Sequence, residues 1–222
     1  MGHQKPLEVK SHASPRASAT LQVIASADVL AKAILVVLVT LVLIEPTWGN
    51  LEGKAPVGRA VMYPMWAFVV PVVWAVRQRF RPSPFPWLPD LLLTLTSFTD
   101  VLGNRLDLYD SVFWFDDLMH FACTALVSAA LVLLTSRTGD RLLDTLTRSV
   151  AFGSTASLVW ELWEFVSFVT RSGESASAYG DTLGDLSHGW LGAVLAAFFV
   201  DHLRGTVRRR TAGRDVGAQR EA

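Results

Sequence analysis

The sequence predicts an all-α, polytopic integral membrane protein, a helical bundle of about six transmembrane helices with its N- and C-termini in the cytoplasm. Hydrophobic residues make up 51% of the 222 residues and charged residues only 18%, whereas soluble domains usually carry about 25% charged residues. The stretch from Ala33 to Ile44 contains one threonine and otherwise only apolar side chains, which leaves no polar face for a soluble helix. Lysine and arginine also gather at alternate loops, as expected for a membrane protein.

Six segments approach the length of about 20 apolar residues that a membrane-spanning helix requires. The first has Lys32 one turn after Asp28, and the second contains Pro64 and Pro71, which neighbouring helices tolerate within a membrane. The third, fifth and sixth are weak by hydropathy alone, and the placement of charge supports them. The predicted spans are residues 28–46, 60–76, 87–103, 112–134, 149–170 and 182–203.

Basic residues set the expected orientation. With a cytoplasmic N-terminus and six alternating spans, fifteen lysines and arginines fall on the cytoplasmic side and four on the outer side, a positive-inside bias. The four outer residues are Lys54, Arg59, Arg105 and Arg171. Lys32 lies within the first span and is expected to snorkel inward. The predicted regions are a disordered cytoplasmic tail at 1–24, a six-helix transmembrane domain at 25–204 and a basic disordered cytoplasmic tail at 205–222.

The net charge and the cysteine count limit the possible partners and covalent bonds of the protein. The formal net charge is zero, which gives no support for a nucleic-acid partner. Cys123 is the only cysteine, so an internal disulfide is excluded. We expect a multi-pass protein of the plasma (inner) membrane whose main partner is the lipid bilayer, and the sequence leaves its oligomeric state open.

Acidic and histidine residues recur at helical spacing in the outer halves of three predicted spans. Residues three or four positions apart share one face of a helix. The residues on shared faces are Asp116 and His120 in the fourth span, Glu161 and Glu164 in the fifth, and Asp181, Asp185 and His188 in the sixth. At a rise of about 1.5 Å per residue, the deeper ones lie roughly 9 to 13 Å below the outer surface. Three helices therefore bring carboxylates and imidazoles to a common depth.

A cation is the simplest partner for these buried acids. A charged side chain near the bilayer centre costs about 2.5 to 3.5 kcal/mol on insertion scales, and the nearest expected basic residues, Arg105 and Arg171, lie only at the rim of this layer. Carboxylates with one or two imidazoles suit Mg, Mn, Zn or Fe. The predicted ligands of a divalent metal ion are Asp116, His120, Glu161, Glu164, Asp181, Asp185 and His188.

Structural interpretations of the same residues remain open. Glu161 and Glu164 would also fit a protonated, hydrogen-bonded pair, and His120 would fit an ordinary hydrogen bond between helices. Asp181 would fit a helix cap next to Thr182.

Short sequence pieces in a fixed order resemble the YjdF-like family of bacterial inner-membrane proteins, a family of uncharacterised function. The pieces are Gly103-Asn104, Leu108-Tyr109-Asp110, Phe115-Asp116, His120-Phe121, Glu161-Leu162-Trp163-Glu164 and Asp181-Thr182 with Asp185. The resemblance covers about residues 95–200 and does not include Asp117 or His188. It implies a multi-span membrane fold, and it supplies no substrate. The site residues it implies are Asp116, His120, Glu161, Glu164, Asp181 and Asp185.

Three functions compete at this point. The first is a membrane-embedded metal-dependent enzyme, with Glu161 or Glu164 as the general base and a lipid, cell-envelope or small-molecule substrate. The second is a transporter or sensor of cations or protons, since acids within membranes often mark ion pathways. Against it, the inner halves of the spans are expected to hold almost no matching polar residues. The third is a structural or accessory membrane protein whose acids are only hydrogen-bonded.

Overall fold

The computed structural model describes residues 15–45, 47–137, 139–167, 169–171 and 178–221, and within these ranges it contains helices and no strands. The all-α class is therefore confirmed. The helices are α1 (Pro15–Ile44), α2 (Pro56–Gln78), α3 (Trp87–Arg105), the short α4 (Leu108–Ser111), α5 (Phe115–Thr135), α6 (Leu142–Ser167), a 3₁₀ turn (Val169–Arg171) and α7 (Ala178–Glu221).

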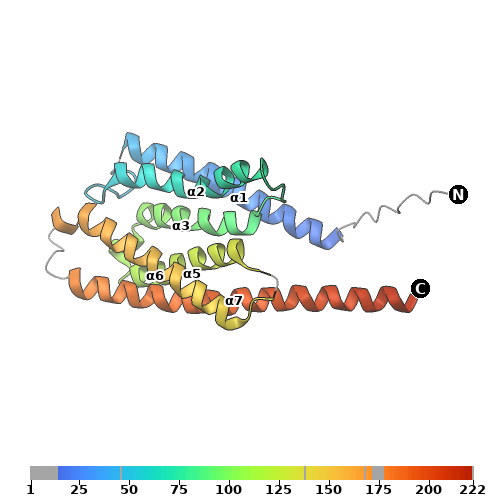
Figure 1. Cartoon of the computed structure of the whole chain (residues 1–222). Coiled ribbons are helices and arrows are strands. Elements are labelled where there is room, and N and C mark those ends of the chain that lie inside the picture. Colours follow the sequence, from blue (N-terminus) through green and yellow to red (C-terminus); the bar gives the residue numbers. More distant parts are fainter. Residues whose placement is uncertain (1–14, 46, 138, 168, 172–177, 222) are drawn as a thin grey trace.

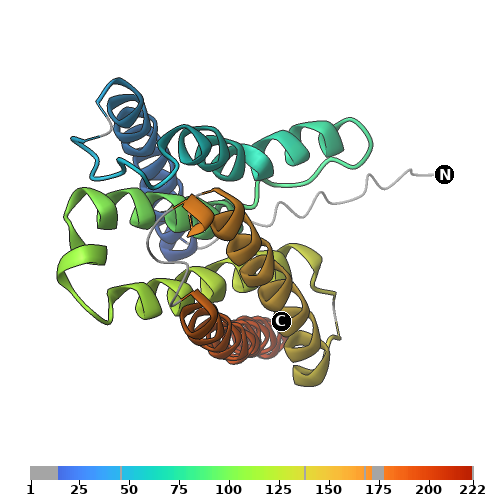
Figure 2. The same cartoon turned by 90° about the vertical axis from the view of Figure 1, so that its left-hand side faces the viewer.

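The long helices run side by side as an elongated bundle (Figure 1). Viewed along the bundle, α1 and α2 lie on one side, α6 and α7 on the other, and α3 and α5 between them (Figure 2). Accordingly α3 packs against α1, α2 and α5, while α5 packs against α3, α6 and α7. The loops after α1 and α3 lie at one end of the bundle, and those after α2 and α5 lie at the other (Figure 1).

Six long helices match the six predicted segments, but hydropathy supports only four of them as membrane spans. The helical stretches long and apolar enough to cross a membrane are Ser18–Ile44, Pro56–Gln78, Phe115–Thr135 and Ala178–Thr206. The other two long helices, α3 and α6, are more polar. In α3 the polar side chains are buried against neighbouring helices, and a helix enclosed by protein does not need a lipid-compatible surface all round. Their crossing of the membrane stays a prediction.

Helix also extends into parts of both terminal segments that the sequence predicted as disordered. The first helix, α1, begins at Pro15, and the last, α7, continues to Glu221. Extending an existing helix adds one hydrogen bond per ordered residue, whereas starting a new one is unfavourable. The region limits and the cytoplasmic position of the tails stay predictions.

Glycines let the last three long helices approach closely. A Cβ atom at Gly192 would overlap the backbone carbonyl oxygen of Phe121 in α5, and one at Gly153 would overlap the Cβ of Ala193 in α7. Small residues at such positions allow helix backbones to come together. Because Gly192 is seven residues after Asp185, it lies on the same face of α7. The close approach therefore carries Asp185 toward α5.

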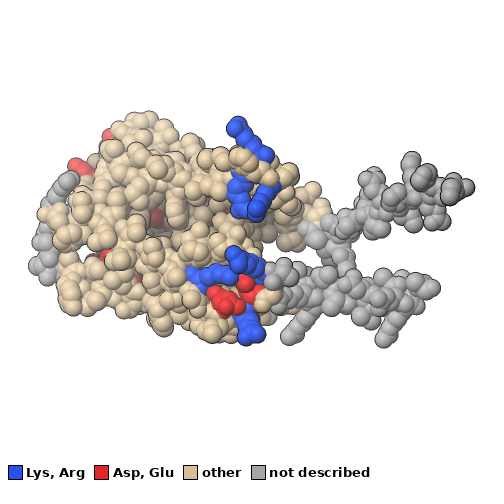
Figure 3. Space-filling view, viewed as in Figure 1, with Lys and Arg blue, Asp and Glu red and all other residues tan. Residues whose placement is uncertain are grey.

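Lysine and arginine side chains visible on one face of the bundle gather near the end where α7 continues outward (Figure 3). This end holds Arg77 in the last turn of α2 and the loop before α6, where Arg148 and Arg204 both contact Asp140. The largest group of acidic atoms on this face lies among these basic side chains, and further acidic atoms appear toward the other end, some of them within hollows of an otherwise uncharged surface (Figure 3). The basic side chains on this face are therefore confined to one end of the bundle, whereas acidic side chains occur at both ends.

Candidate metal centre

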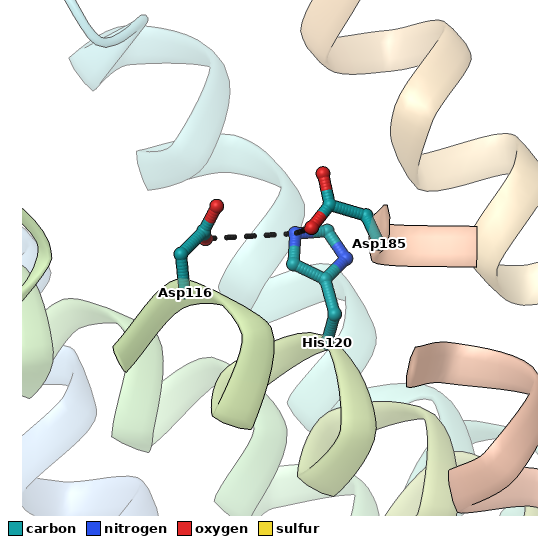
Figure 4. A group of neighbouring side chains, drawn as sticks. All are labelled: Asp116, His120 and Asp185. Carbon is teal, nitrogen blue, oxygen red and sulfur yellow. Dashed lines mark ion pairs between the residues drawn. The ribbon is translucent and has the colours of Figure 1, made fainter. Parts of the chain in front are cut away.

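His120 lies at the centre of the predicted acidic cluster. Its Nε2 atom is 3.6 Å from Oδ1 of Asp116, one turn earlier in α5, and 3.7 Å from Oδ1 of Asp185 in α7. The three side chains point toward one another from the two helices (Figure 4). His120 and Asp185 are buried, while Asp116 is partly exposed. The sequence spacing therefore correctly indicated that these residues approach one another.

The other imidazole nitrogen faces a third helix. Nδ1 of His120 is 3.4 Å from Oε1 of Glu161 in α6. Glu161 is 7% exposed, and this oxygen has no hydrogen-bond partner among the described residues. The imidazole is therefore enclosed by carboxylates at both of its nitrogens.

This arrangement is electrostatically incomplete for a neutral imidazole, which has one N–H donor and one acceptor nitrogen. If Nδ1 donates to Glu161, the lone pair of Nε2 points at the carboxylates of Asp116 and Asp185. A cation between them, or a second proton on the ring, would remove the repulsion. Ligand atoms about 2.1 Å from a common ion at tetrahedral angles lie roughly 3.4 Å apart. The observed separations of 3.6 and 3.7 Å are close to that value.

Two groups of residues in the described chain have the spacing that a metal ion needs. One is Asp116, His120 and Asp185, and the other is His120, Glu161 and Glu164; in each group one ligand atom per residue lies within 4.8 Å of the others. The two groups share His120, so they form one continuous centre across α5, α6 and α7.

Glu164 has a basic partner that the sequence did not predict. Arg59 was expected at the outer surface, but its side chain is buried, and Nη2 lies 3.5 Å from Oε1 of Glu164. The guanidinium also lies 5.5 Å from the ring centres of both Trp160 and Trp163. The expectation that no basic residue reaches the acidic layer is therefore wrong, because α2 brings Arg59 inward.

Asp100 of α3 is the main partner of Arg59. Nη1 of Arg59 donates to Oδ2 of Asp100 at 2.7 Å and also contacts the Tyr63 hydroxyl. The Tyr63 hydroxyl donates to the same carboxylate oxygen, and the Tyr109 hydroxyl donates to Oδ1 at 2.8 Å. Asp100 thus accepts three hydrogen bonds from donors in α2 and α4, which makes it a structural anchor rather than a free ligand.

Three acidic or histidine side chains lie outside the centre. Nδ1 of His188 is 3.2 Å from Oδ1 of Asp117, and both side chains are about half exposed. Asp181 is exposed in the first turn of α7 and belongs to neither metal-spaced group. Helical spacing placed Asp181, Asp185 and His188 on one broad face, but only Asp185 points at His120.

A second buried charge cluster lies at the opposite half of α3. Nζ of Lys32 is 2.9 Å from Oδ2 of Asp90 and 2.7 Å from the Thr94 hydroxyl, and it also pairs with Asp28 one turn earlier. Oδ1 of Asp90 has no hydrogen-bond partner within the described part of the chain. The expectation that the inner halves of the spans carry almost no polar residues is therefore wrong. Lys32 is held by this cluster between α1 and α3 instead of snorkelling.

A cavity of about 680 Å³ adjoins the acidic centre. Arg59, Asp100, Asp116, His120 and Glu164 line its polar end, whereas Glu161 and Asp185 do not reach its surface. Its remaining wall is largely apolar. Near the outer loops, Lys54 lies 2.6 Å from Asp110 across the cavity rim, and this hydrogen bond lowers the pKa of Asp110 from its usual value. The cavity can therefore bring a ligand to Asp116, His120 and Glu164.

Comparison with known proteins identifies a family and no function. No curated protein and no solved structure matches the chain. A family model described as "Predicted membrane protein (DUF2238)" matches residues 27–205, which include all six long helices apart from their terminal extensions. The match agrees with the resemblance to YjdF-like membrane proteins, and with the four apolar helices it places the chain in a lipid bilayer. The chain belongs to the DUF2238 family of predicted membrane proteins.

Proposed function

We propose that the protein is a membrane-embedded, metal-dependent enzyme of the plasma membrane, with six spans, cytoplasmic termini and a divalent-metal site in the outer half of the bundle. The observation that carries the proposal is the environment of His120, whose Nε2 faces Asp116 and Asp185 while Nδ1 faces Glu161. Histidines that bind metals usually donate their second N–H to a carboxylate or carbonyl, which fixes the ring orientation. Glu161 would fill that role, and Asp116, His120 and Asp185 would supply the ligands.

Within this proposal Glu164 is the general base. It lines the cavity, its carboxylate lies within 4.8 Å of ligand atoms of His120 and Glu161, and Arg59 holds its position. Glu161 is buried beside His120 and does not line this cavity, so it positions the imidazole. A bound divalent ion would polarise a phosphoryl or carbonyl oxygen or activate a water molecule. The proposed reaction class is hydrolysis or transfer at such a group.

The remaining predicted ligands have supporting roles or none. Asp181 lines the cavity near the metal position and would contact a ligand rather than the ion. His188 pairs with Asp117, and we assign it no part in metal binding.

Metal analysis of the purified full chain tests the proposal. After exposure to Mg, Mn, Zn or Fe and removal of free metal, we expect about one ion per chain. Asp116→Asn and Asp185→Asn should lose the ion while remaining folded, because each keeps its size and removes one anionic ligand. Asp117→Asn and His188→Gln are the matched controls on the same helices and should retain it.

Thermal unfolding separates metal binding from simple hydrogen bonding of buried acids. A ligand that binds only the folded state raises the unfolding temperature, so the wild-type protein should be stabilised by the metal and the two ligand variants should not. Equal metal content in the wild type, Asp116→Asn and Asp185→Asn would refute the site. The remaining hypothesis would then be a structural or accessory membrane protein whose buried acids are only hydrogen-bonded.

The Lys32 cluster favours a second candidate function, the transport or sensing of cations or protons. Buried polar residues follow one face of α3 from this cluster to the acidic centre at spacings of three or four. They are Asp90, Thr94, Ser97, Asp100 and Asn104. The unpaired Oδ1 of Asp90 would accept a proton or a cation there.

Flux measurements distinguish the second function from the first. Vesicles containing the wild-type protein should move protons or a monovalent cation down an imposed gradient, and Asp90→Asn should abolish the movement without changing metal content. Absence of any flux in the wild type would exclude transport, and the metal analysis then decides between the metal-dependent enzyme and the structural protein.

A further inference from the structure

A window between α2 and α6 connects the cavity to the side of the bundle. The backbones of these two helices stay apart within the described chain, and their side chains meet at the outer end, where Arg59 and Tyr63 contact α6. Their facing residues line the cavity, and they are Met62, Met65, Trp66 and Val69 in α2 and Ala156, Val159 and Trp160 in α6. Met65 is 68% exposed and Val159 is 59% exposed, so both form the outer rim of the window.

The window is closed at its two ends along the bundle. At the outer end, Arg59 pairs with Glu164 and lies over Trp160 and Trp163, and a Cβ at Gly58 would lie 3.2 Å from Trp163. At the other end, Val69 and Ala156 pack against a common apolar core that includes Val70 and Val127. The opening therefore faces sideways, toward the lipid that surrounds the bundle.

The lining changes from apolar to acidic with depth. Methionine, valine and tryptophan side chains form the mouth, and Asp116, His120 and Glu164 lie further in. Five carboxylates line the cavity, from Asp100, Asp110, Asp116, Glu164 and Asp181, against two basic side chains, Lys54 and Arg59. Both basic side chains are already paired with acids. The carboxylates exceed the basic side chains by three, and a divalent ion would offset only two of these negative charges. The cavity therefore stays acidic with the ion bound, and a head that carries an amine beside its phosphate is more complementary than a head with net negative charge.

We infer that the cavity takes a membrane lipid whose head carries an amine, with the head at the acidic end and an acyl chain leaving through the window between α2 and α6. This inference rests on the proposed function, for which it names the substrate class. A soluble ligand could reach the acidic end from the outer loops, where Asp110 and Asp181 are exposed, but it would leave the apolar slot unfilled. An acyl chain moves from the bilayer into that slot with little change in environment. The cavity volume of about 680 Å³ is within the range of pockets that bury drug-sized ligands, about 300 to 1,000 Å³, so it can hold the head and part of one chain.

Photocrosslinking from the lipid tests the inference without relying on catalysis. The full chain is placed in vesicles of phosphatidylethanolamine and phosphatidylglycerol that contain a trace of phosphatidylethanolamine with a diazirine in its acyl chain. After illumination, we expect adducts on Thr124, Val127 or Ser157, which line the cavity and are buried from the surrounding lipid. Adducts confined to outward-facing side chains such as Leu158 and Leu162 would overturn the inference.

Two pairs of variants establish the route. Ala156→Trp should fill the window and remove the deep adducts, whereas Leu158→Trp, two residues away and outside the cavity lining, should leave them unchanged. On α2, Met65→Trp should likewise block the window, and Val61→Trp, one turn earlier and outside the cavity lining, is its control. This second pair replaces the first if Ala156→Trp does not fold. Deep adducts that persist in both blocked variants would refute access through the window.

The head group and the metal give separate outcomes. A phosphatidylglycerol probe with the same diazirine chain should give weaker deep adducts than the phosphatidylethanolamine probe, and equal labelling would overturn the assignment of an amine. Absence of bound metal together with deep adducts would refute the proposed function and keep the lipid site. Normal metal content without deep adducts would refute the lipid site and keep the proposed function.

Discussion

Arg59 of α2 and Asp100 of α3 form a buried ion pair, with Nη1 2.7 Å from Oδ2, at the outer end of the bundle. Their side chains are 5% and 10% exposed. The pair also brings in Glu164 through Nη2 and Tyr63 through its hydroxyl. The guanidinium of Arg59 therefore links α2 to α3 and to α6, and it lines the outer end of the cavity next to the candidate metal centre.

The first prediction concerns this pair. Arg59→Gln should lower the free energy of unfolding by about 3 to 5 kcal/mol, because removing one partner of a buried pair leaves an uncompensated charge. Arg105→Gln is the control, since Arg105 is exposed and lies over the Trp48 ring at 4.5 Å, a contact that contributes about 0.5 to 1 kcal/mol. Unfolding of the purified protein in detergent measures both. Equal losses would show that Arg59 is not a structural anchor.

Sequence reasoning recovered the helices and much of the centre, because both depend on local periodicity. Asp116 and His120 are one turn apart, and this spacing alone aims both side chains at one place. Arg59 was missed because its partner Asp100 is 41 residues away, and nothing local separates a buried arginine from a loop residue. Tyr63, one turn after Arg59, was the only available signal, as a polar partner on the same face.

Contacts between distant residues also decide features of α3 and α7 that the sequence alone does not show. Polar residues along α3 lower its hydropathy, and only contacts with α1, α2 and α5 show that they are enclosed by protein. In α7, a helical face spans a wide angle, so the sequence grouped His188 with Asp185. The close contact of Gly192 with Phe121 fixes the rotation of α7, and no pattern within a single helix contains that information.

The second prediction concerns Lys32. Lys32→Met should destabilise the protein by about 3 to 5 kcal/mol, because Asp28 and Asp90 would remain buried without their cation. The matched control is Lys54→Met, whose partner Asp110 has a side chain that is 52% exposed; exposed pairs contribute about 0 to 1 kcal/mol. The comparison uses the unfolding assay described for Arg59. A Lys32 variant as stable as the Lys54 variant would contradict the buried-cluster interpretation.

The third prediction concerns topology. Six spans place residue 106, after α3, outside the membrane and residue 141, before α6, in the cytoplasm; four spans without α3 and α6 reverse both. In a Cys123→Ala background, Leu106→Cys should react with a membrane-impermeant maleimide in intact cells. Arg141→Cys should react only after lysis. The reverse labelling would show that α3 and α6 do not cross the bilayer.

The fourth prediction concerns pH and uses Asp140, in the loop between α5 and α6. The backbone N–H of Arg137 and the side chain of Arg148 lower the pKa of this carboxyl below its usual value of 3.8. A depressed folded-state pKa gives stability that is fully present above the unfolded pKa and is lost as the pH falls through the folded one.

Asp140→Asn should therefore lower the unfolding temperature at neutral pH, and its difference from the wild type should shrink as the pH falls below 3.8. Unfolding temperatures in detergent across this pH range measure the effect, and high salt should reduce it. A difference that stays constant to low pH would mean that the charge of Asp140 is not responsible.

The fifth prediction separates the two glutamates of α6. Glu161→Gln should weaken metal binding about ten- to a hundredfold without abolishing it, because it removes the carboxylate that orients a ligand histidine and leaves the ligands in place. Glu164→Gln should leave metal affinity nearly unchanged, since Arg59 holds that carboxylate, while it should abolish any metal-dependent turnover. Titration of the metal-free protein gives both affinities. If Glu161→Gln binds metal as tightly as the wild type, Nδ1 of His120 does not depend on Glu161; if Glu164→Gln loses the metal, the ion instead lies on the Glu161–Glu164 side of the imidazole.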